Sequence, residues 1–523
     1  EWSTLNIQWR EWVYPTNTSF TKITLSNGLT LYGDFTAGSY VSFDQEPITI
    51  LGSAGSDSIA PLIDAPSGIL VGGAGDDTFV ISAYTPAGEI HGHAQSGAPM
   101  PAGEVNTVHA DGPIDLTAWQ ISNISKFAAL NGGSVTLLNS QITASDTEFD
   151  GESPLEVTIV IADANLLDFS SLQFTNWNAN YPDVYFELSA VFSPASLNLK
   201  LTSTGDDLDT SGYAGELSVD AGAGNDEIFG YGSSVVLNGG DGVDQLRAYG
   251  TANLVNGGVG NDVLSAVGAG DSTLNGGEGN DRLSAGSLGS NMIDGGDGDD
   301  EIWAYRGHGT ITAGAGNDTV EVDIAGVDGY LIDGGTGNDS IEGGAGNDSL
   351  IGGSGSNVLR GGAGHDLFTA GSGIDDMDGG SGNDTFSFGT GSIQTGDAVF
   401  GFSADTGDVL EITADLDLSR LGVSAISTLD LNGHTGTVTW RQINNLAVGE
   451  IASTVSGGGL TVVGNANLSS VMIDSGIAIT MNGSPGNNTL VGSVLDDTIN
   501  GLAGNDVISG LDGDDLLTGG AGE

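Results

Sequence analysis

The sequence has no cysteine and very few basic residues. Its 523 residues include 10 Lys and Arg against 69 Asp and Glu, which leaves a formal net charge of −59. Without disulfides, an exported chain needs another kind of crosslink, and bound metal can supply one. A polyanion of this size repels itself when compact unless cations neutralise it. It also offers no basic patch, so we expect no nucleic-acid partner.

Long apolar runs are missing as well. The longest candidate, residues 155–167, is interrupted by Glu156, Thr158 and Asp163, and a bilayer-spanning helix needs about 20 apolar residues. We therefore predict no transmembrane segment. The chain opens on Glu1-Trp2 without a signal peptide and closes in the middle of a repeat. We interpret it as a piece of a larger protein.

Motifs for catalysis are absent too, and we predict that this chain is not an enzyme. It contains no His-Glu-x-x-His, no Gly-x-Ser-x-Gly and no P-loop, and it has no cysteine nucleophile. Carboxylates are numerous enough to leave a glycosidase pair open, but their regular spacing favours metal ligation. Zinc at His91, His93 and His109 is a weaker alternative, because no further ligand follows at a suitable spacing.

Glycine, by contrast, is abundant and periodic. The chain has 88 glycines, and residues 221–386 repeat the pattern G-G-x-G-x-D-x-U-x, in which U is apolar; residues 257–265 are one copy. Glycine permits positive φ, so a six-residue turn can coil tightly and point its carbonyls inward. The alternation that follows each Asp predicts a short strand with one buried face. The buried positions would be Ile228, Leu246, Leu264, Leu283, Ile302, Val320, Ile341, Leu350, Phe368 and Phe386.

The spacing of the aspartates predicts where metal would bind. Calcium takes about 6–8 oxygen ligands, more than one turn offers, so each ion would lie between two stacked coils. From Asp226 to Asp318 successive aspartates are 18 or 19 residues apart, and from Asp339 the step falls to 9. A coil of two strands and two turns takes about 18 residues. We therefore predict one metal-bearing edge that becomes two after Asp339, with Asn357 weakening one site.

This repeat resembles that of the RTX (repeats-in-toxin) family. The resemblance implies an all-β fold, a parallel β-roll or β-helix with calcium-binding nonapeptide turns plus small β domains. It also implies export in an unfolded state by type I secretion from Gram-negative bacteria, followed by folding in external calcium. The carboxylate of each turn would bind Ca²⁺ together with backbone carbonyls. The aspartates so assigned are Asp57, Asp77, Asp207, Asp226, Asp244, Asp262, Asp281, Asp300, Asp318, Asp339, Asp348, Asp366, Asp375, Asp384, Asp497, Asp506 and Asp515.

Composition divides the chain into five predicted segments. They are an N-terminal β domain (1–50), degenerate repeats with plain β-helix (51–204), the main calcium β-roll (205–390), a β cap or intervening domain (391–482) and a second repeat block (483–523). Asn27-Gly28 between alternating apolar residues predicts a hairpin over 23–32. The aromatic cluster Trp2, Trp9, Trp12 and Tyr14 is either a small core or a sugar platform.

The segment after the main roll has expectations of its own. Residues 398–410 resemble the acidic strand pair that follows RTX blocks and would close the open end of the roll, since exposed coil ends invite aggregation. In the β domain expected over 411–481, Trp440 would be a core residue.

These features predict a calcium-dependent extracellular structural protein of a bacterial surface layer or cell-surface matrix, which self-associates into a lattice or filament. Residues 104–204 bear a weaker resemblance to linking segments of RTX surface-layer proteins. One alternative is a section of an adhesin that binds cell-surface glycan or lipopolysaccharide. Another is the non-catalytic part of a secreted RTX enzyme or toxin.

Overall fold

The computed structural model describes residues 193–268, 270–286, 289–323, 329–401, 407–445 and 450–522 continuously, and strands and short turns separated by gaps before residue 193. The chain forms two compact units, Glu1–Leu246 and Arg247–Glu523. Helix within the described residues is limited to α1 (Trp440–Asn445) and the 3-10 turns η1 (Asn139–Gln141) and η2 (Leu418–Arg420). None of these is long and apolar enough to cross a membrane. The five-segment division stays a prediction.

The first unit opens on the hairpin that the sequence predicted. Strand β1 (Ser19–Leu25) pairs antiparallel with β2 (Thr30–Thr36) and with β3 (Ile48–Leu51). Strand β3 then pairs in parallel with β5 (Ile69–Val71), so the hairpin leads directly into a parallel stack. The aromatic cluster Trp2 to Tyr14 lies outside the described residues.

The rest of the first unit consists of parallel coils, each strand pairing with the strand two or more elements away. One sheet contains β7 (Glu89–His91) and β10 (Gln120–Ser122) together with β1, β2, β3 and β5, and another contains β4 (Ser58–Ile59), β6 (Thr78–Ser82), β8 (Thr107–Asp111), β11 (Lys126–Ala129), β13 (Glu148–Asp150) and β15 (Gln173–Thr175). A third sheet contains β9 (Ile114–Asp115), β12 (Ser134–Leu138), β14 (Glu156–Ile161), β16 (Val184–Leu188), β18 (Asp206–Asp209) and β20 (Glu227–Tyr231), and a fourth contains β17 (Ser196–Lys200), β19 (Glu216–Ala223) and β21 (Ser234–Asp241). The chain passes from the first unit to the second within β22 (Gln245–Tyr249).

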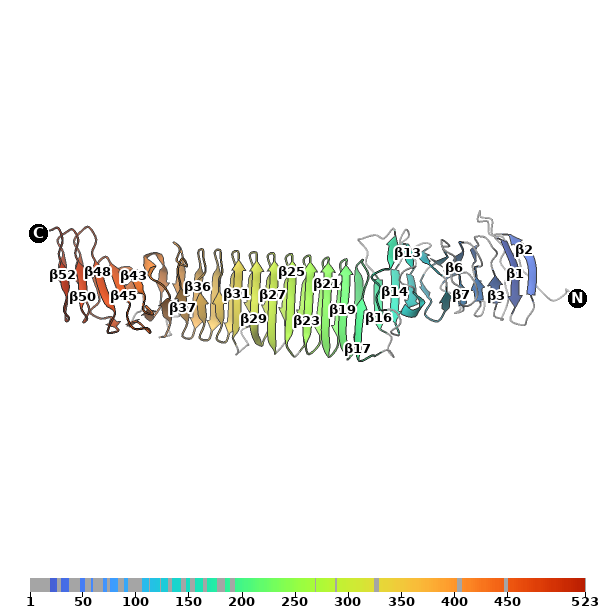
Figure 1. Cartoon of the computed structure of the whole chain (residues 1–523), viewed down its shortest axis with the longest axis horizontal. Coiled ribbons are helices and arrows are strands. Elements are labelled where there is room, and N and C mark those ends of the chain that lie inside the picture. Colours follow the sequence, from blue (N-terminus) through green and yellow to red (C-terminus); the bar gives the residue numbers. More distant parts are fainter. Residues whose placement is uncertain are drawn as a thin grey trace. The chain divides into compact units, whose positions relative to one another are not determined.

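The second unit is a longer stack in which the chain alternates between two parallel sheets (Figure 1). One sheet contains β23 (Asn253–Val259), β25 (Ser272–Glu278), β27 (Ser290–Asp297), β29 (His308–Ala315), β31 (Tyr330–Thr336), β33 (Ser349–Ile351), β35 (Leu367–Thr369), β37 (Thr385–Phe388), β39 (Val409–Ile412), β42 (Thr428–Asp430), β44 (Glu450–Ala452) and β47 (Met472–Ile473). The other contains β24 (Val263–Ala266), β26 (Arg282–Ala285), β28 (Glu301–Ala304), β30 (Thr319–Val322), β32 (Ser340–Ala345), β34 (Val358–Ala363), β36 (Asp376–Ser381), β38 (Ala398–Phe400) and β41 (Gly422–Ser424).

Two further sheets follow towards the C-terminus of this unit. One contains β40 (Leu416–Asp417), β43 (Thr435–Thr439), β45 (Gly459–Val463), β48 (Ala478–Asn482), β50 (Asp497–Asn500) and β52 (Leu516–Thr518). The other contains β46 (Ala466–Asn467), β49 (Thr489–Val491) and β51 (Val507–Ser509). The strands of the second unit pair in parallel, as do those of the first unit apart from the antiparallel pairs of β1. The predicted all-β parallel fold is therefore confirmed.

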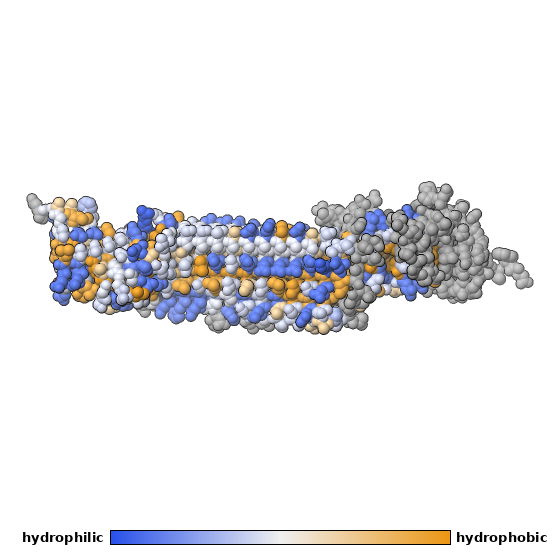
Figure 2. Space-filling view, in the orientation of Figure 1, coloured by the Kyte–Doolittle hydropathy of each residue, from blue (hydrophilic) through white to orange (hydrophobic). Residues whose placement is uncertain are grey.

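The core of the second unit is a column of identical positions stacked in register. Leu264 faces Leu283, and Leu283 faces Ile302 in the next coil; these side chains are at most 1% exposed. The turn glycines carry the chain around each corner, as at Gly277 with φ of 118°. Because strand side chains alternate between faces, polar and apolar residues form bands along the outer surface (Figure 2).

The segment after the main roll continues the stack instead of closing it. Strand β38 pairs with β36 on one side and β41 on the other, and β39 likewise lies between β37 and β42. Trp440 is only half-buried at the start of α1, so its prediction as a core residue is wrong. Val438 and Ile443, 1% and 4% exposed, occupy the core there. The β-strand pattern of the preceding residues hid the short helix that begins at Trp440.

We expect Phe368→Ala to lower the free energy of unfolding by about 3–5 kcal/mol, because it leaves a cavity in a closely packed core. The Phe368 ring is fully buried and stacks on Phe386 with centroids 4.7 Å apart. Denaturant titration at saturating calcium measures the change. The neighbouring Leu367 is 41% exposed, so Leu367→Ala should change stability by less than about 1 kcal/mol. Equal losses in the two variants would contradict this packing.

Candidate metal centres

The sixth residue of each glycine-rich turn takes part in a ladder of hydrogen bonds that runs along the edge of the stack. The backbone N–H of Asp262 donates to Oδ1 of Asp281 at 2.8 Å, and Asp281 and Asp300 repeat the contact with Asp300 and Asp318 at 2.7 and 2.8 Å. In the first unit, Asp226 donates in the same way to Asp244 at 2.9 Å. Each carboxylate is therefore held by the coil before it.

The second carboxylate oxygen of these residues is buried and has no donor. Among the described residues, Oδ2 accepts no hydrogen bond in Asp226, Asp281, Asp300, Asp318, Asp339, Asp348, Asp366, Asp375 and Asp506. These side chains belong to residues that are largely or wholly buried. An unpaired buried carboxylate oxygen is costly, so its repetition along the edge indicates a cation partner.

The surroundings of Oδ2 fit calcium. The first glycine of each turn leaves open the place where a side chain would stand: a Cβ on Gly257 would lie 2.4 Å from Asp262 Oδ2 and 2.6 Å from the carbonyl oxygen of Gly276. The carboxylate of one coil thus faces a carbonyl of the next, and both are hard oxygen donors. The described residues contain no group of three His, Cys, Asp or Glu side chains suited to a metal, so backbone carbonyls would have to supply further ligands.

Burial also changes the protonation of these carboxyl groups in the absence of metal. Desolvation raises the pKa of Asp226 and Asp300 from the ordinary 3.8 to about 7. It raises the pKa of Asp281 to about 6, and that of Asp348 likewise. Hydrogen bonds from the preceding backbone amides act in the opposite direction but are weaker. A proton or a cation can therefore neutralise the same oxygen.

A second ladder starts on the opposite edge, where the aspartate spacing falls to 9. The N–H of Tyr330 donates to Oδ1 of Asp348 at 2.7 Å, and Asp348 and Asp366 continue the series to Asp366 and Asp384. On the first edge the ladder continues at the same time from Asp339. The change from one ladder to two is the arrangement that the spacing predicted.

The opposite edge of the earlier coils is closed by neutral side chains. Asn253 is 5% exposed; its Oδ1 accepts the Gly250 N–H at 2.9 Å, and its Nδ2 donates to the Gly250 carbonyl at 3.2 Å. Further along, Asn291 Nδ2 donates to the Tyr330 hydroxyl at 2.9 Å. These amide and hydroxyl groups have protein partners, so this edge needs no ion.

Asn357 continues the hydrogen-bond ladder of the first edge with an amide in place of a carboxylate, and its weakening of a metal site stays a prediction. Its Oδ1 accepts the Asp339 N–H at 3.0 Å, and its Nδ2 donates to Asp375 Oδ1 at 3.0 Å. An NH₂ group therefore occupies the place where neighbouring turns present Oδ2, and it lies 3.0 Å from a Cβ built on Gly352. A donor cannot ligate a cation, so this turn is a gap between candidate sites.

The structure places most of the predicted metal ligands in ladders but changes some assignments. Ladder positions are held by Asp226, Asp244, Asp262, Asp281, Asp300, Asp318, Asp339, Asp348, Asp366, Asp375, Asp384, Asp497, Asp506 and Asp515. Asp77 is buried, and its N–H donates to Asn106 Oδ1 at 2.9 Å. Asp57 lies outside the described residues.

Of the neighbours Asp206 and Asp207, the structure places Asp206 in the ladder, so the sequence-based choice of Asp207 is wrong. Asp206 is 2% exposed and donates its N–H to Asp226 Oδ1, whereas Asp207 is half-buried on the outer side of β18. The buried Leu208 follows Asp206 by two residues, which is the spacing that identifies the ladder position. The same signal marks Asp397 and Asp408, which sequence reasoning missed because longer turns precede them; they accept from Asp375 at 3.1 Å and Asp384 at 3.0 Å.

The zinc alternative finds no support at His91. Its Nδ1 lies 2.6 Å from Ser122 Oγ, and its Nε2 lies 3.0 Å from Glu89 Oε2, so both ring nitrogens have side-chain partners. His109 lies half-buried in β8, and His93 falls outside the described residues.

Parallel coils, glycine turns and a repeated buried carboxylate define a β-solenoid built for inter-coil ligands. The family described as the RTX calcium-binding nonapeptide repeat (4 copies) matches residues 218–246, 236–264, 265–288, 285–320, 331–359, 360–392 and 491–523. These segments are RTX repeats, and the resemblance to the RTX family is confirmed by them. A comparison with curated proteins finds no match to this chain.

We expect the metal-free chain to be more structured in acid than at neutral pH. The folded pKa values of about 6 to 7 lie above the ordinary 3.8, so the folded state binds protons more tightly than the unfolded state. This contribution to stability is complete below about pH 4 and is lost as the pH rises through about 7. Circular dichroism of the EGTA-treated protein should show β signal increasing as the pH falls. A signal independent of pH would contradict the assignment.

Proposed function

We propose that this chain is a calcium-dependent extracellular structural protein of a Gram-negative cell surface, part of a surface layer or matrix, which folds and assembles after type I secretion. The observation that supports it best is the row of buried aspartate Oδ2 atoms without donors, several of which lie beside a carbonyl of the next coil, as at Asp281, Asp300 and Asp339. Such a row makes the stack dependent on a cation that is scarce inside cells and abundant outside.

The proposed calcium ligands are the ladder carboxylates, most of them in a turn whose first residue is glycine; Ala221, Ala313 and Ala370 hold that place before Asp226, Asp318 and Asp375. We assign them to Asp226, Asp244, Asp262, Asp281, Asp300, Asp318, Asp339, Asp348, Asp366, Asp375, Asp384, Asp506 and Asp515, with Asp57 and Asp77 as further candidates in the first unit. Asp408 joins them, because a Cβ on Gly401 would lie 2.3 Å from its Oδ2 and 2.6 Å from the Ala425 carbonyl. Calcium would supply positive charge between coils that otherwise present adjacent carboxylates.

The same chemistry explains the coupling of folding to export. The unfolded chain has no preformed site, so the free energy of ion binding becomes free energy of folding. At low calcium, a net charge of −59 favours an expanded chain that can be threaded through a secretion channel. At external calcium concentrations the ions bind between coils and stabilise the roll.

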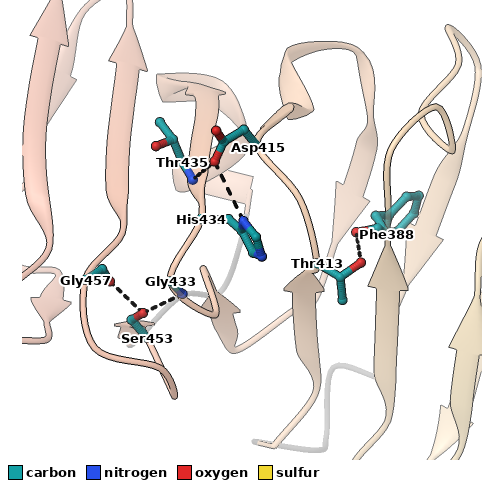
Figure 3. Close-up of polar contacts among 8 residues, drawn as sticks. All are labelled: Phe388, Thr413, Asp415, Gly433, His434, Thr435, Ser453 and Gly457. Carbon is teal, nitrogen blue, oxygen red and sulfur yellow. Dashed lines mark hydrogen bonds and ion pairs between the residues drawn. The ribbon is translucent and has the colours of Figure 1, made fainter.

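The architecture of the described residues favours a structural role. They form coils with continuous apolar columns and repeated turns, and RTX β-rolls are generally non-catalytic. In the segment between repeat blocks, short polar contacts hold the coils: Thr413 Oγ1 donates to the Phe388 carbonyl at 3.1 Å, and Asp415 Oδ1 accepts from the Thr435 N–H at 2.7 Å (Figure 3). These groups stabilise the stack instead of converging on a ligand.

We expect Asp300→Asn to weaken calcium-dependent folding, because the amide replaces a ligand oxygen with a donor. The loss is about 2.7 kcal/mol when calcium is present at 100 times the dissociation constant of the site. Calcium titration followed by circular dichroism measures it. Asp297→Asn is the matched control, since Asp297 is exposed in the same coil and its substitution removes the same charge. Equal shifts in the two variants would show general charge relief instead of ligation.

Electron microscopy of the purified chain tests the structural role itself. A lattice or filament that forms in millimolar calcium and dissolves in EGTA supports the proposal. Calcium-folded particles that remain dispersed and are retained by immobilised glycan or lipopolysaccharide would favour the adhesin instead. A full β signal after exhaustive EGTA dialysis at neutral pH, with no bound metal, would overturn the role of calcium altogether.

A further inference from the structure

The repeat turns are of two kinds, which differ in the backbone conformation of their second residue. In most turns with an unpartnered Oδ2, it has a positive φ, as in Gly277 at 118° and Gly296 at 109°; Gly371, in the turn of Asp375, is the exception. In the C-terminal block, Leu502 takes the same conformation with φ of 74°, and Oδ2 of Asp506 accepts no hydrogen bond. A positive φ is unfavourable for leucine, so the conformation is a property of this kind of turn and not of glycine alone.

In three other turns the second residue is serine or threonine, outside the left-handed region, and it caps the sixth residue. Thr202 donates its N–H to Asp206 Oδ2 and its Oγ1 to Oδ1, both at 2.7 Å. Ser493 donates its N–H to Asp497 Oδ2 at 2.7 Å, and its hydroxyl lies 3.1 and 3.2 Å from the two carboxylate oxygens. The Ser484 N–H donates to Asn488 Oδ1 at 2.8 Å, and its hydroxyl accepts from Asn488 Nδ2 at 2.9 Å.

The first glycine has similar surroundings in the turns of Asp497 and Asp506. A Cβ on Gly492 would lie 2.4 Å from Asp497 Oδ2 and 2.7 Å from the Gly510 carbonyl. The equivalent distances at Gly501 are 2.5 Å to Asp506 Oδ2 and 2.6 Å to the Gly519 carbonyl. The two turns differ at positions two and four, where Ser493 and Leu495 lack the positive φ of Leu502 at 74° and Gly504 at 132°.

Asp206, Asn488 and Asp497 each donate to the next residue of a ladder, whereas the ladder that starts at Tyr330 reaches Asp348, whose Oδ2 accepts no hydrogen bond. Within a ladder, Oδ1 accepts the amide of the preceding ladder residue, as Asp515 does from Asp497 at 3.0 Å. At Asp206 and Asp497, the Ser or Thr hydroxyl supplies that hydrogen bond from within the turn. The same residue's amide then occupies Oδ2, the atom that would otherwise face a cation.

We propose that the turns of Asp206 and Asp497 are closed by their Thr202 and Ser493 caps and bind no calcium, so that these two turns are held by protein hydrogen bonds alone. This inference rests on the proposed calcium function. It revises the sequence-based assignment of Asp497 as a ligand. The capped turn provides an ordered edge before calcium arrives, on which the first metal-binding coil can stack.

Native mass spectrometry of the full chain in calcium counts the bound ions and tests the proposal. Asp497→Asn should leave the number unchanged, whereas Asp506→Asn should lower it by about one ion per chain. Ser493→Gly should raise it by about one ion, because glycine can adopt positive φ and release Oδ2. Ser470→Gly, in an exposed turn outside the repeats, is the matched control and should leave the number unchanged.

The possible failures are distinguishable. If Asp497→Asn lowers the number as much as Asp506→Asn does, the cap does not close the site and the inference is wrong, while the calcium function stands. If Ser493→Gly stays folded by circular dichroism but gains no ion, the inference is likewise overturned. A wild-type chain that binds no calcium would overturn both the inference and the proposed function.

Discussion

A buried carboxylate with one oxygen satisfied and the other unpaired is the constraint on which this structure depends. Oδ1 of each ladder aspartate accepts an amide from the preceding coil, which fixes the stacking distance and register. Oδ2 is then left without a donor, in several of them beside a carbonyl of the following coil. Since an unpaired charge of this kind is unfavourable in a low-dielectric site, the stack at neutral pH requires a cation, and the cation couples neighbouring coils.

The stack uses several devices to join its coils, and metal is one of them. Neutral amides such as Asn253 and the Tyr330 hydroxyl close the opposite edge of the earlier coils, and hydroxyl caps hold the turns of Asp206 and Asp497. The side chains at the fifth turn position form a separate row of hydrogen bonds that runs in the other direction. The Asn280 N–H, for example, donates to Oδ1 of Asn261 in the coil before it, at 2.9 Å. Positions five and six therefore bind each coil to both neighbours, and metal is needed only where position six leaves an oxygen unpaired.

Much of the architecture was predictable because the repeat encodes it locally. The apolar residue two places after each aspartate is buried at Leu264, Leu283 and Ile302, since strand geometry puts alternate residues on opposite faces. The step from 18 to 9 residues predicted where the second ladder begins. The errors fell where the repeat is irregular: Asp207 was chosen over Asp206, and Asp397 and Asp408 were hidden by turns of unusual length. Residues 398–410 carry further coils because their strands keep both edges open to parallel pairing.

By itself, the sequence determined the parallel all-β fold, the apolar columns, the glycine turns and the family to which the repeats belong, because each depends on spacing within a few residues. Tertiary structure alone decided which carboxylate oxygens have a hydrogen-bond donor and which do not. Asp497 and Asp506 both occupy the sixth place of a turn that begins with glycine, but Ser493 donates to one, while the other has no donor for its second oxygen. The reason is physical: ligation depends on the φ of turn residues and on donors from adjacent coils, and neither is encoded by the spacing of the aspartates.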